Sequence, residues 1–267
     1  MAPDKRKDMT MPGRALGYDE AGEGPVLLLV HGFPLDRTMW AEQISGLSDI
    51  RRVVAVDLRG RGKSPEAGDG WTVDDYADDV AATIDSLGVD KVDLAGMSMG
   101  GYVVFAAWRR HPDKIRSVIL INTKAEADSQ EAKEAREKTA IMVREKGTSE
   151  LINGLFPKMF APGANDTVKD KVRPMFEDTP SETAAADALV MKGRPDSTSD
   201  LGSINVPALV IQGEEDSIMS VDGSKAMAGN ISGARFATVP SAGHMAPVEN
   251  PEAVNRAIRE FLDGIED

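Results

Sequence analysis

The 267-residue sequence contains no cysteine and only three histidines. Without a thiol the chain can form no disulfide, cannot use a cysteine nucleophile, and cannot bind zinc or an iron–sulfur cluster through sulfur. Any covalent catalysis therefore has to use another side chain. An imidazole base, if one is needed, has to be one of the three histidines.

Basic residues are fewer than acidic ones: 31 Lys and Arg against 44 Asp and Glu give a net charge of −13. Such an excess of acid repels phosphate backbones and anionic lipid, so we expect no nucleic-acid and no membrane partner. No apolar run approaches the roughly 18 residues that span a bilayer. The charged start, residues 1–10, lacks the apolar stretch of a secretory signal. We therefore expect a cytoplasmic protein, and the sequence predicts no particular oligomeric state.

Short apolar runs rich in β-branched residues recur along the chain, and most are separated by amphipathic stretches of helical length. Runs of this kind are typical of strands buried on both faces of a parallel sheet. In residues 74–87, Tyr76, Val80 and Ile84 recur at helical spacing, which predicts a helix with one apolar face. The alternation predicts an α/β fold with a mostly parallel, doubly wound sheet flanked by helices. The runs are 26–30, 53–56, 92–95, 118–121, 208–211 and 236–239, and a last helix is expected over 251–262.

One long segment, residues 124–195, interrupts this alternation with helix-forming stretches punctuated by prolines. A connection of about 70 residues far exceeds the usual handful, and long insertions often act as lids. We therefore expect residues 1–123 and 196–267 to form the sheet core, and 124–195 to form a helical cap over its carboxyl edge. The alternative is a helical subdomain with a purely structural role. The helix-forming stretches are 125–143, 149–156, 168–176 and 181–191.

A serine lies in a glycine-flanked turn between a predicted strand and a predicted helix. The sequence Gly-Met-Ser-Met-Gly at 96–100 follows the strand 92–95 and precedes a helix expected over 102–110. A strained turn of this kind needs small residues on both sides, so that neighbouring backbone does not collide with it. The hydroxyl would then project at a helix N-terminus, where the dipole and free N–H groups favour a developing anion. Ser98 is therefore the candidate nucleophile.

A serine hydroxyl needs a base, and the three histidines differ in their settings. His244 lies in a loop of small residues after the strand 236–239, at the kind of strand end where α/β proteins place their sites. His111 ends a predicted helix, where an exposed position at the helix terminus is the simpler interpretation. His31 follows the first buried strand, and we expect it to form hydrogen bonds within its own loop. His244 is thus the preferred base.

The base needs a carboxylate to orient it, and three acidic residues follow the strand 208–211. They are Glu214, Glu215 and Asp216, and on position alone any of them could reach His244. At least two of the three are then expected to be solvated surface charges.

A possible oxyanion hole follows the first buried strand. Gly32 permits a tight turn there, and the backbone N–H groups of Phe33 and Met99 could converge on a substrate carbonyl oxygen.

Five motifs, in this order and with this approximate spacing, resemble those of the α/β-hydrolase fold family. The resemblance points in particular to the small bacterial esterases, enol-lactonases and cofactor-free haloperoxidases. The motifs extend over nearly the whole chain and are specific in combination. They are His-Gly-Phe-Pro at 31–34, Asp-Leu-Arg-Gly-Arg-Gly-Lys-Ser at 57–64, Gly-Met-Ser-Met-Gly-Gly at 96–101, Gly-Glu-Glu-Asp at 213–216 and Gly-His at 243–244.

The resemblance implies roles for these residues. Ser98 would be the nucleophile, His244 its base and Asp216 the orienting acid. The N–H groups of Phe33 and Met99 would form the oxyanion hole, and residues 124–195 would be the cap.

The chain also departs from some members of the family. Epoxide hydrolases and haloalkane dehalogenases have an aspartate at the nucleophile position, so Ser98 disfavours alkyl-enzyme chemistry. Some relatives place the acid after the strand that precedes the cap. Here that strand ends in Asn122 and Thr123, which weakens this alternative, although Glu126 and Asp128 follow shortly. The family's amino-terminal hairpin is only partly legible in this sequence.

These features predict a serine hydrolase, carboxylesterase-like, that cleaves small to medium carboxylic esters through an acyl-enzyme intermediate. The same machinery could open a lactone, cleave a C–C bond or form a peracid from peroxide. A third alternative is a non-enzymatic ligand receptor on the same fold. We expect a small-molecule ester or lactone as the partner. We expect no metal and no organic cofactor, because the histidines are not clustered and no phosphate loop is present.

The residues expected around Ser98 are apolar, and the methionines among them can adapt to varied ligand shapes, which predicts modest selectivity. For those in the insertion, core packing is an equal alternative. Residues 195–267 carry twelve acidic and four basic side chains, so we expect a weak bias against strongly anionic substrates. The expected pocket residues are Trp40, Met97, Phe156, Met159, Phe160, Met191 and Met245.

Overall fold

The computed structural model describes residues 14–265 except 63, 65 and 67–69. In this part of the chain, seven strands form one sheet in the order β1-β3-β2-β4-β5-β6-β7. Only β1 runs antiparallel to its neighbour, while the other adjacent pairs are parallel. The mostly parallel α/β sheet predicted from the apolar runs is confirmed. The strands are β1 (Tyr18–Ala21), β2 (Val26–Val30), β3 (Arg52–Val56), β4 (Val92–Met97), β5 (Ile115–Ile121), β6 (Ala208–Gly213) and β7 (Arg235–Val239).

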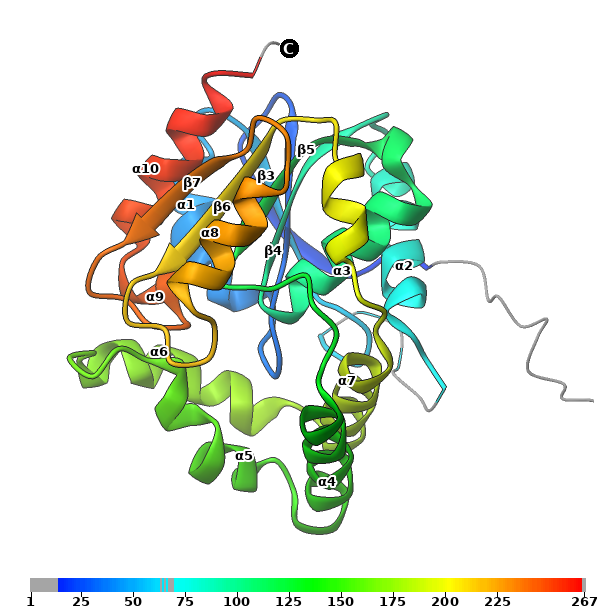
Figure 1. The fold of residues 1–267 in the computed structure, drawn as a ribbon, viewed down its shortest axis with the longest axis vertical. Coiled ribbons are helices and arrows are strands. Elements are labelled where there is room, and N and C mark those ends of the chain that lie inside the picture. The colour runs from blue at the N-terminus through cyan, green and yellow to red at the C-terminus, as the bar shows by residue number, and fades with distance from the viewer. Residues whose placement is uncertain (1–13, 63, 65, 67–69, 266–267) are drawn as a thin grey trace, which may run out of the picture.

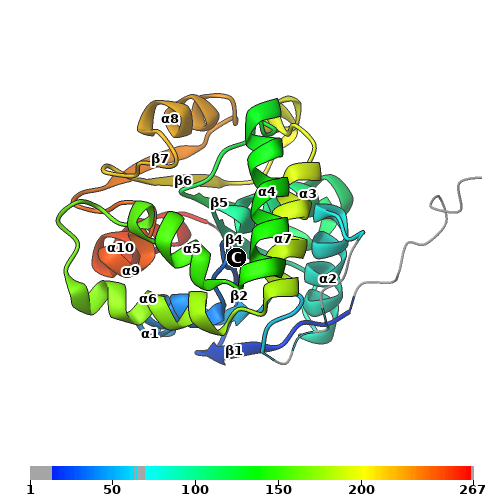
Figure 2. The same ribbon diagram turned by 90° about the horizontal axis from the view of Figure 1, so that it is seen from below.

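Helices cover both faces of this sheet. The first and last helices, α1 and α10, pack together on one face, whereas α2 and α3 pack together on the other (Figures 1 and 2). Among the described residues, no helix is both long and apolar enough to cross a membrane. The charged start at 1–10 lies outside the described residues. The helical elements of the core are η2 (Arg37–Trp40), α1 (Ala41–Leu47), α2 (Val73–Ser86), α3 (Met99–Arg110), η3 (Pro112–Lys114), η5 (Thr198–Ser203), α8 (Val221–Gly229), α9 (Ala246–Glu249) and α10 (Pro251–Leu262).

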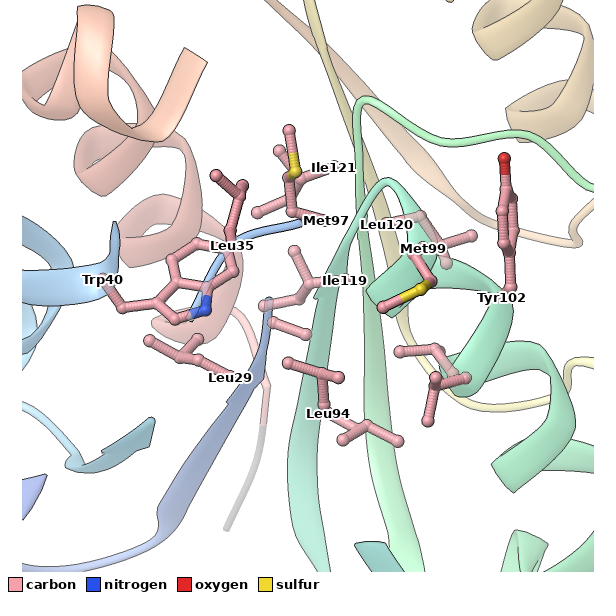
Figure 3. Packing of buried hydrophobic residues seen from close by; sticks show 14 of the residues in the cluster. Leu29, Leu35, Trp40, Leu94, Met97, Met99, Tyr102, Ile119, Leu120 and Ile121 are labelled. Carbon is pink, nitrogen blue, oxygen red and sulfur yellow. The ribbon is translucent and has the colours of Figure 1, made fainter. Parts of the chain in front are cut away.

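The central strands carry apolar residues on both faces because other parts of the chain pack against both faces. Every residue of β2 and β4 is buried. Figure 3 shows Leu35 and Trp40 on one side of these strands, and Met99 and Tyr102 on the other. In a strand buried on both faces, every side chain is removed from water, so an apolar residue is favourable at each position rather than at every second one. The apolar runs in the sequence are continuous for this reason.

The amino-terminal strand shows why its part of the sequence is hard to interpret. β1 pairs with β3 rather than with β2, so it does not form a hairpin with the next strand in the chain. Its first three residues are exposed. An exposed edge strand has no need of an apolar run, and it therefore leaves only a weak pattern in the sequence.

A helical insertion, residues 124–195, joins β5 to β6 and gathers at one end of the sheet (Figures 1 and 2). It contacts loops that follow parallel strands: Thr183 Oγ1 donates to Gly60 O after β3, and Met245 N after β7 donates to Met159 O. The insertion thus lies on the carboxyl end of the sheet. Its elements are α4 (Gln130–Lys146), α5 (Ser149–Gly154), η4 (Phe156–Met159), α6 (Asp166–Asp178) and α7 (Ser181–Gly193).

The first helix of the insertion begins later than its sequence predicts. Helix-forming residues start at Ala125, but α4 starts at Gln130 because the Ser129 side chain accepts the Ala132 N–H and caps the helix there. The preceding residues are used differently, since Ser197 N donates to Ala125 O and joins the two chain segments that connect the insertion to the core. The expected helix start at Ala125 is therefore wrong.

These two connecting segments are also joined by a buried ion pair. Asp128 Oδ1 lies 2.9 Å from Arg194 Nη1, and Arg136 Nε donates to Asp128 Oδ2 at 3.1 Å. The Arg194 guanidinium also lies over the Tyr102 ring, 3.9 Å from its centre. Burial alone would raise the pKa of Asp128, but Arg136 and Arg194 outweigh it and hold the pKa below its ordinary value near 3.8.

We expect the variant Asp128→Asn to lower the free energy of unfolding by about 2 kcal/mol at pH 7, because the buried arginine loses a charged acceptor. A carboxyl whose pKa is lower in the folded protein stabilises it above the unfolded pKa, and that stability is lost as the pH falls through the folded pKa. The difference between wild type and variant should therefore shrink below pH 3.8. Guanidinium unfolding between pH 7 and pH 3 measures it, and a difference that grows on acidification would contradict this account.

Candidate active site

Ser98 occupies the turn between β4 and α3 in a backbone conformation that few residues adopt. Its φ and ψ are 54° and −114°, and the turn is held by Ser98 N donating to Ile121 O at 2.9 Å. Thr123 Oγ1 donates to Ser98 O at 2.8 Å. A Cβ at Gly100 would lie 2.2 Å from Val30 O, so glycine is required there. The expected sharp strand-to-helix turn is present, and its strain is held by bonds to the end of β5.

His244 lies between Ser98 and Asp216. Its Nε2 is 2.9 Å from Ser98 Oγ, and its Nδ1 is 2.8 Å from Asp216 Oδ2. Because an ionised carboxylate can only accept, Nδ1 carries the proton and Nε2 is left to accept the serine O–H. The three side chains come from the loops after β4, β6 and β7, and the parallel sheet brings these strand ends to one edge.

The Asp216 carboxylate is surrounded by donors. Oδ1 accepts the N–H groups of Ile218 at 2.7 Å and Met219 at 3.0 Å. Oδ2 accepts Asn122 Nδ2 at 2.7 Å and Gln212 Nε2 at 3.2 Å in addition to His244. Burial raises the pKa of Asp216, but the hydrogen bonds from His244, Asn122 and the Met219 N–H outweigh it, so the pKa lies below its ordinary value. The carboxylate is therefore ionised at neutral pH.

The other acidic candidates lie elsewhere. Glu214 and Glu215 are exposed, and Glu214 accepts from Thr238 on β7. Asp128 forms ion pairs with Arg136 and Arg194 of the insertion, and Glu126 is exposed. At the end of β5, where some relatives would hold an acid, Asn122 donates to Asp216 instead.

The remaining two histidines are engaged away from Ser98. His31 is fully buried, donates Nδ1–H to Gly32 O at 2.8 Å and accepts Leu58 N–H on Nε2 at 3.0 Å. Burial, and to a smaller extent Arg61, lowers its pKa well below the ordinary value, so the ring is neutral. His111 Nε2 lies 2.7 Å from Asp78 Oδ1 at the end of α3.

The two backbone segments expected to form an oxyanion hole both lie beside Ser98. Met99 is the first residue of α3, and an N–H in the first turn of a helix has no partner within the helix. A Cβ at Gly32 would lie 3.1 Å from Ser98 Cβ, so the turn that leads into Phe33 runs directly beside Ser98.

The apolar residues expected around the site are all buried, but some lie in the core of the sheet domain and others in the insertion. Trp40 and Met97 belong to the core shown in Figure 3. Phe156 packs edge-on against Phe160 and Phe176, with ring centres 4.9 and 5.2 Å apart. The remaining three expected residues are also buried. Met159 and Met245 are joined by the backbone bond described above, and Met191 lies on α7 and accepts from Arg194 through its carbonyl.

Several residues at this site were not expected from the sequence. The sequence predicts Asn122 and Thr123 only as a strand end without a carboxylate, but Asn122 donates to Asp216 and Thr123 donates to Ser98 O. The sequence also predicts no role for Gln212, which donates to Asp216, or for Glu249, which accepts the N–H of Gly243 beside His244. A possible signal was the Asn-Thr pair at the end of a predicted strand, where site residues concentrate in α/β proteins.

Throughout the described ranges, no group of three His, Asp or Glu side chains is arranged to hold a metal ion.

Residues 25–251 match the family described as alpha/beta hydrolase fold. A solved structure of a thermophilic esterase from Thermogutta terrifontis is 41% identical, with a TM-score of 0.92 and 94% of each chain covered. The enol-lactonase from Burkholderia xenovorans is 30% identical, with a TM-score of 0.85 and 93% and 96% of the two chains covered. A bifunctional esterase/perhydrolase from Acinetobacter calcoaceticus is 29% identical over 270 residues, which cover 95% of this chain and 98% of the relative.

Proposed function

The chain belongs to the α/β-hydrolase fold family, and from this we propose that it is a serine hydrolase that cleaves small to medium carboxylic esters. The observation that carries the proposal is the continuous hydrogen-bonded series from Asp216 through His244 to Ser98, with distances of 2.8 and 2.9 Å. This arrangement is the minimum that a serine hydroxyl needs to act as a nucleophile at neutral pH.

The proposed reaction has two steps. Ser98 Oγ attacks the ester carbonyl while His244 Nε2 takes its proton, and Asp216 stabilises the resulting imidazolium. The negative charge on the carbonyl oxygen is met by the N–H groups of Met99 and Phe33. The imidazolium then protonates the leaving alcohol, and a water activated by His244 hydrolyses the acyl-enzyme.

We assign the insertion, residues 124–195, the role of a cap on the core formed by residues 1–123 and 196–267. Support comes from its contacts with the loops after β3 and β7. In this assignment, the expected residues of the insertion and of the core together form an apolar pocket at Ser98. Apolar walls exclude water and favour an uncharged acyl group.

A fluorophosphonate probe tests the proposal together with p-nitrophenyl esters of increasing acyl length. We expect one probe molecule per chain, attached to Ser98 on peptide mapping, and hydrolysis of at least the shorter esters. Labelling at a different residue, or ester turnover that continues after complete labelling, would contradict the assignment.

Lactone opening and peracid formation are the alternatives with specific support, because similar proteins are named as an enol-lactonase and an esterase/perhydrolase. All three reactions use the same nucleophile. Assays of an ester, a lactone, and an acid with peroxide, run side by side on one preparation, rank them by kcat/KM.

We predict that a dicarboxylate half-ester is hydrolysed more slowly than the uncharged ester of equal size. The acidic side chains of residues 195–267 outnumber the basic ones by twelve to four, and this segment carries Asp216 and His244. Half-esters are informative because the Thermogutta esterase was solved with malate bound. The measurement is kcat/KM for the two esters at low and high salt. Faster turnover of the half-ester would overturn the prediction.

A further inference from the structure

The insertion is hydrogen-bonded to two of the three loops that carry the candidate catalytic residues Ser98, Asp216 and His244, namely those after β6 and β7. Ser217 Oγ, one residue after Asp216, donates to Lys158 O at 3.1 Å. Met245 N, one residue after His244, donates to Met159 O at 2.9 Å. Residues 158–161 of the insertion thus form a short bridge between the loop after β6, which carries Asp216, and the loop after β7, which carries His244 and is called the histidine loop below.

The side chain of Glu249 completes this bridge. Glu249 is the last residue of α9, which follows the histidine loop. Its Oε1 accepts Gly243 N–H at 2.9 Å, and its Oε2 accepts Ala161 N–H at 2.8 Å. One carboxylate therefore joins the residue before His244 to the backbone of the insertion, using a separate oxygen for each N–H group.

The contact between the two backbones leaves little space for movement. A Cβ placed on Gly243 would lie 2.4 Å from Ala161 N and 2.6 Å from Phe160 C. His244 itself is buried and has both ring nitrogens engaged. A displacement of the insertion at Ala161 would therefore move the chain segment that carries the imidazole.

We propose that Glu249 is a positioning residue that holds His244 in line with Ser98. By accepting from Gly243 and Ala161 together, the carboxylate clamps the histidine loop against residues 158–161 and keeps Nε2 in reach of the serine hydroxyl. This inference rests on the proposed function, because it assigns His244 the role of the base. A misplacement of about 1 Å in a catalytic group can cost on the order of 100-fold in rate.

The test compares Glu249→Gln and Glu249→Ala with wild type. Glutamine has one acceptor oxygen, so it can satisfy only one of the two N–H groups, and alanine satisfies neither. We expect kcat per probe-labelled site to fall about 10-fold in Glu249→Gln and about 100-fold in Glu249→Ala, with KM within about threefold of wild type. Counting sites by the fluorophosphonate label removes any unfolded fraction from the comparison.

Two variants serve as controls. Glu252→Gln makes the same change of charge at an exposed residue three positions along. Asp187→Asn weakens a different contact between the insertion and the core, the ion pair with Arg61. Both should retain kcat per labelled site, although Asp187→Asn should lower the melting temperature at least as much as Glu249→Gln.

A spectroscopic measurement follows His244 directly. With three histidines in the chain, the low-field proton resonance of the His244–Asp216 hydrogen bond can be assigned by histidine labelling and its loss in His244→Ala. We expect this resonance to broaden or shift upfield in both Glu249 variants and to remain in both controls.

Unchanged kcat and an unchanged resonance in Glu249→Gln and Glu249→Ala would overturn the positioning role. Equal losses of kcat in Asp187→Asn would also overturn it, since the effect would then follow from general loosening of the insertion. If wild type carries no label and hydrolyses no ester, the proposed function fails, and the resonance alone still decides whether Glu249 orders His244.

Discussion

Replacing Ser98 by alanine is expected to lower kcat for an activated ester by at least about 10³-fold and to abolish labelling by a fluorophosphonate. The reason is structural, because the serine oxygen is the atom that His244 Nε2 approaches at 2.9 Å. The substitution removes only this hydroxyl, and the hydrogen bonds that shape the turn come from backbone atoms and from Thr123. KM should therefore change little, and near-ultraviolet circular dichroism should remain that of wild type.

A matched pair of histidine variants distinguishes the proposed base, His244, from His111. His244→Ala should reduce kcat about as strongly as Ser98→Ala, because residues that act as one unit are not additive. His111→Ala should retain activity within about twofold, since His111 pairs with Asp78 at the end of α3 and surface pairs contribute little. A double variant of Ser98 and His244 that is no slower than either single variant would support their joint action.

A Ser98→Ala enzyme that keeps more than a tenth of wild-type kcat would rule out Ser98 as the nucleophile.

The second large effect is expected on stability, from the variant Asp187→Ala. Asp187 is fully buried on α7, where Arg61 Nη2 approaches its Oδ2 at 2.6 Å and Tyr76 O–H donates to its Oδ1 at 2.6 Å. Burial and the neighbouring carboxylate raise the pKa of Tyr76 well above its ordinary value, so the phenol is a neutral donor. Removing the carboxylate leaves a buried guanidinium and a buried phenol without this acceptor. We expect a loss of about 3–5 kcal/mol in the free energy of unfolding.

Guanidinium unfolding followed by tryptophan fluorescence measures this loss. The matched control is Glu137→Ala on α4, which removes an exposed partner of Lys192; Lys192 lies on α7, as Asp187 does. Glu137→Ala should lower the free energy of unfolding far less than Asp187→Ala, because exposed pairs are screened by solvent. A loss in Asp187→Ala no greater than in this control would show that the buried pair does not fasten the insertion to the core.

Much of the fold can be predicted from local pattern, because a strand buried on both faces needs an apolar run. Each of the six runs lies within or coincides with a strand, and the expected helix at 251–262 matches α10. The pattern fails where burial does not constrain it, as in the exposed β1. It also fails where a cap overrides helix propensity, as Ser129 does at the start of α4.

The sequence alone determined the candidate chemistry. The absence of cysteine leaves Ser98 as the candidate nucleophile, the small number of histidines makes His244 the preferred base, and the family resemblance singles out Asp216. The choice of Ser98 and His244 needs only residue type and position relative to a strand end, because the carboxyl ends of parallel strands meet at one edge of the sheet. The choice of Asp216 over Glu214 and Glu215 needs the family resemblance as well.

The tertiary structure decided which polar groups support that chemistry. Asn122 reaches Asp216, Glu249 joins Gly243 to Ala161, and Asp187 closes on Arg61. Each of these contacts joins segments that are separate in the chain, and a hydrogen bond requires donor and acceptor within about 3 Å in a set direction. Neither periodicity nor composition encodes such a distance, so only the packing of the insertion and the strand ends reveals it.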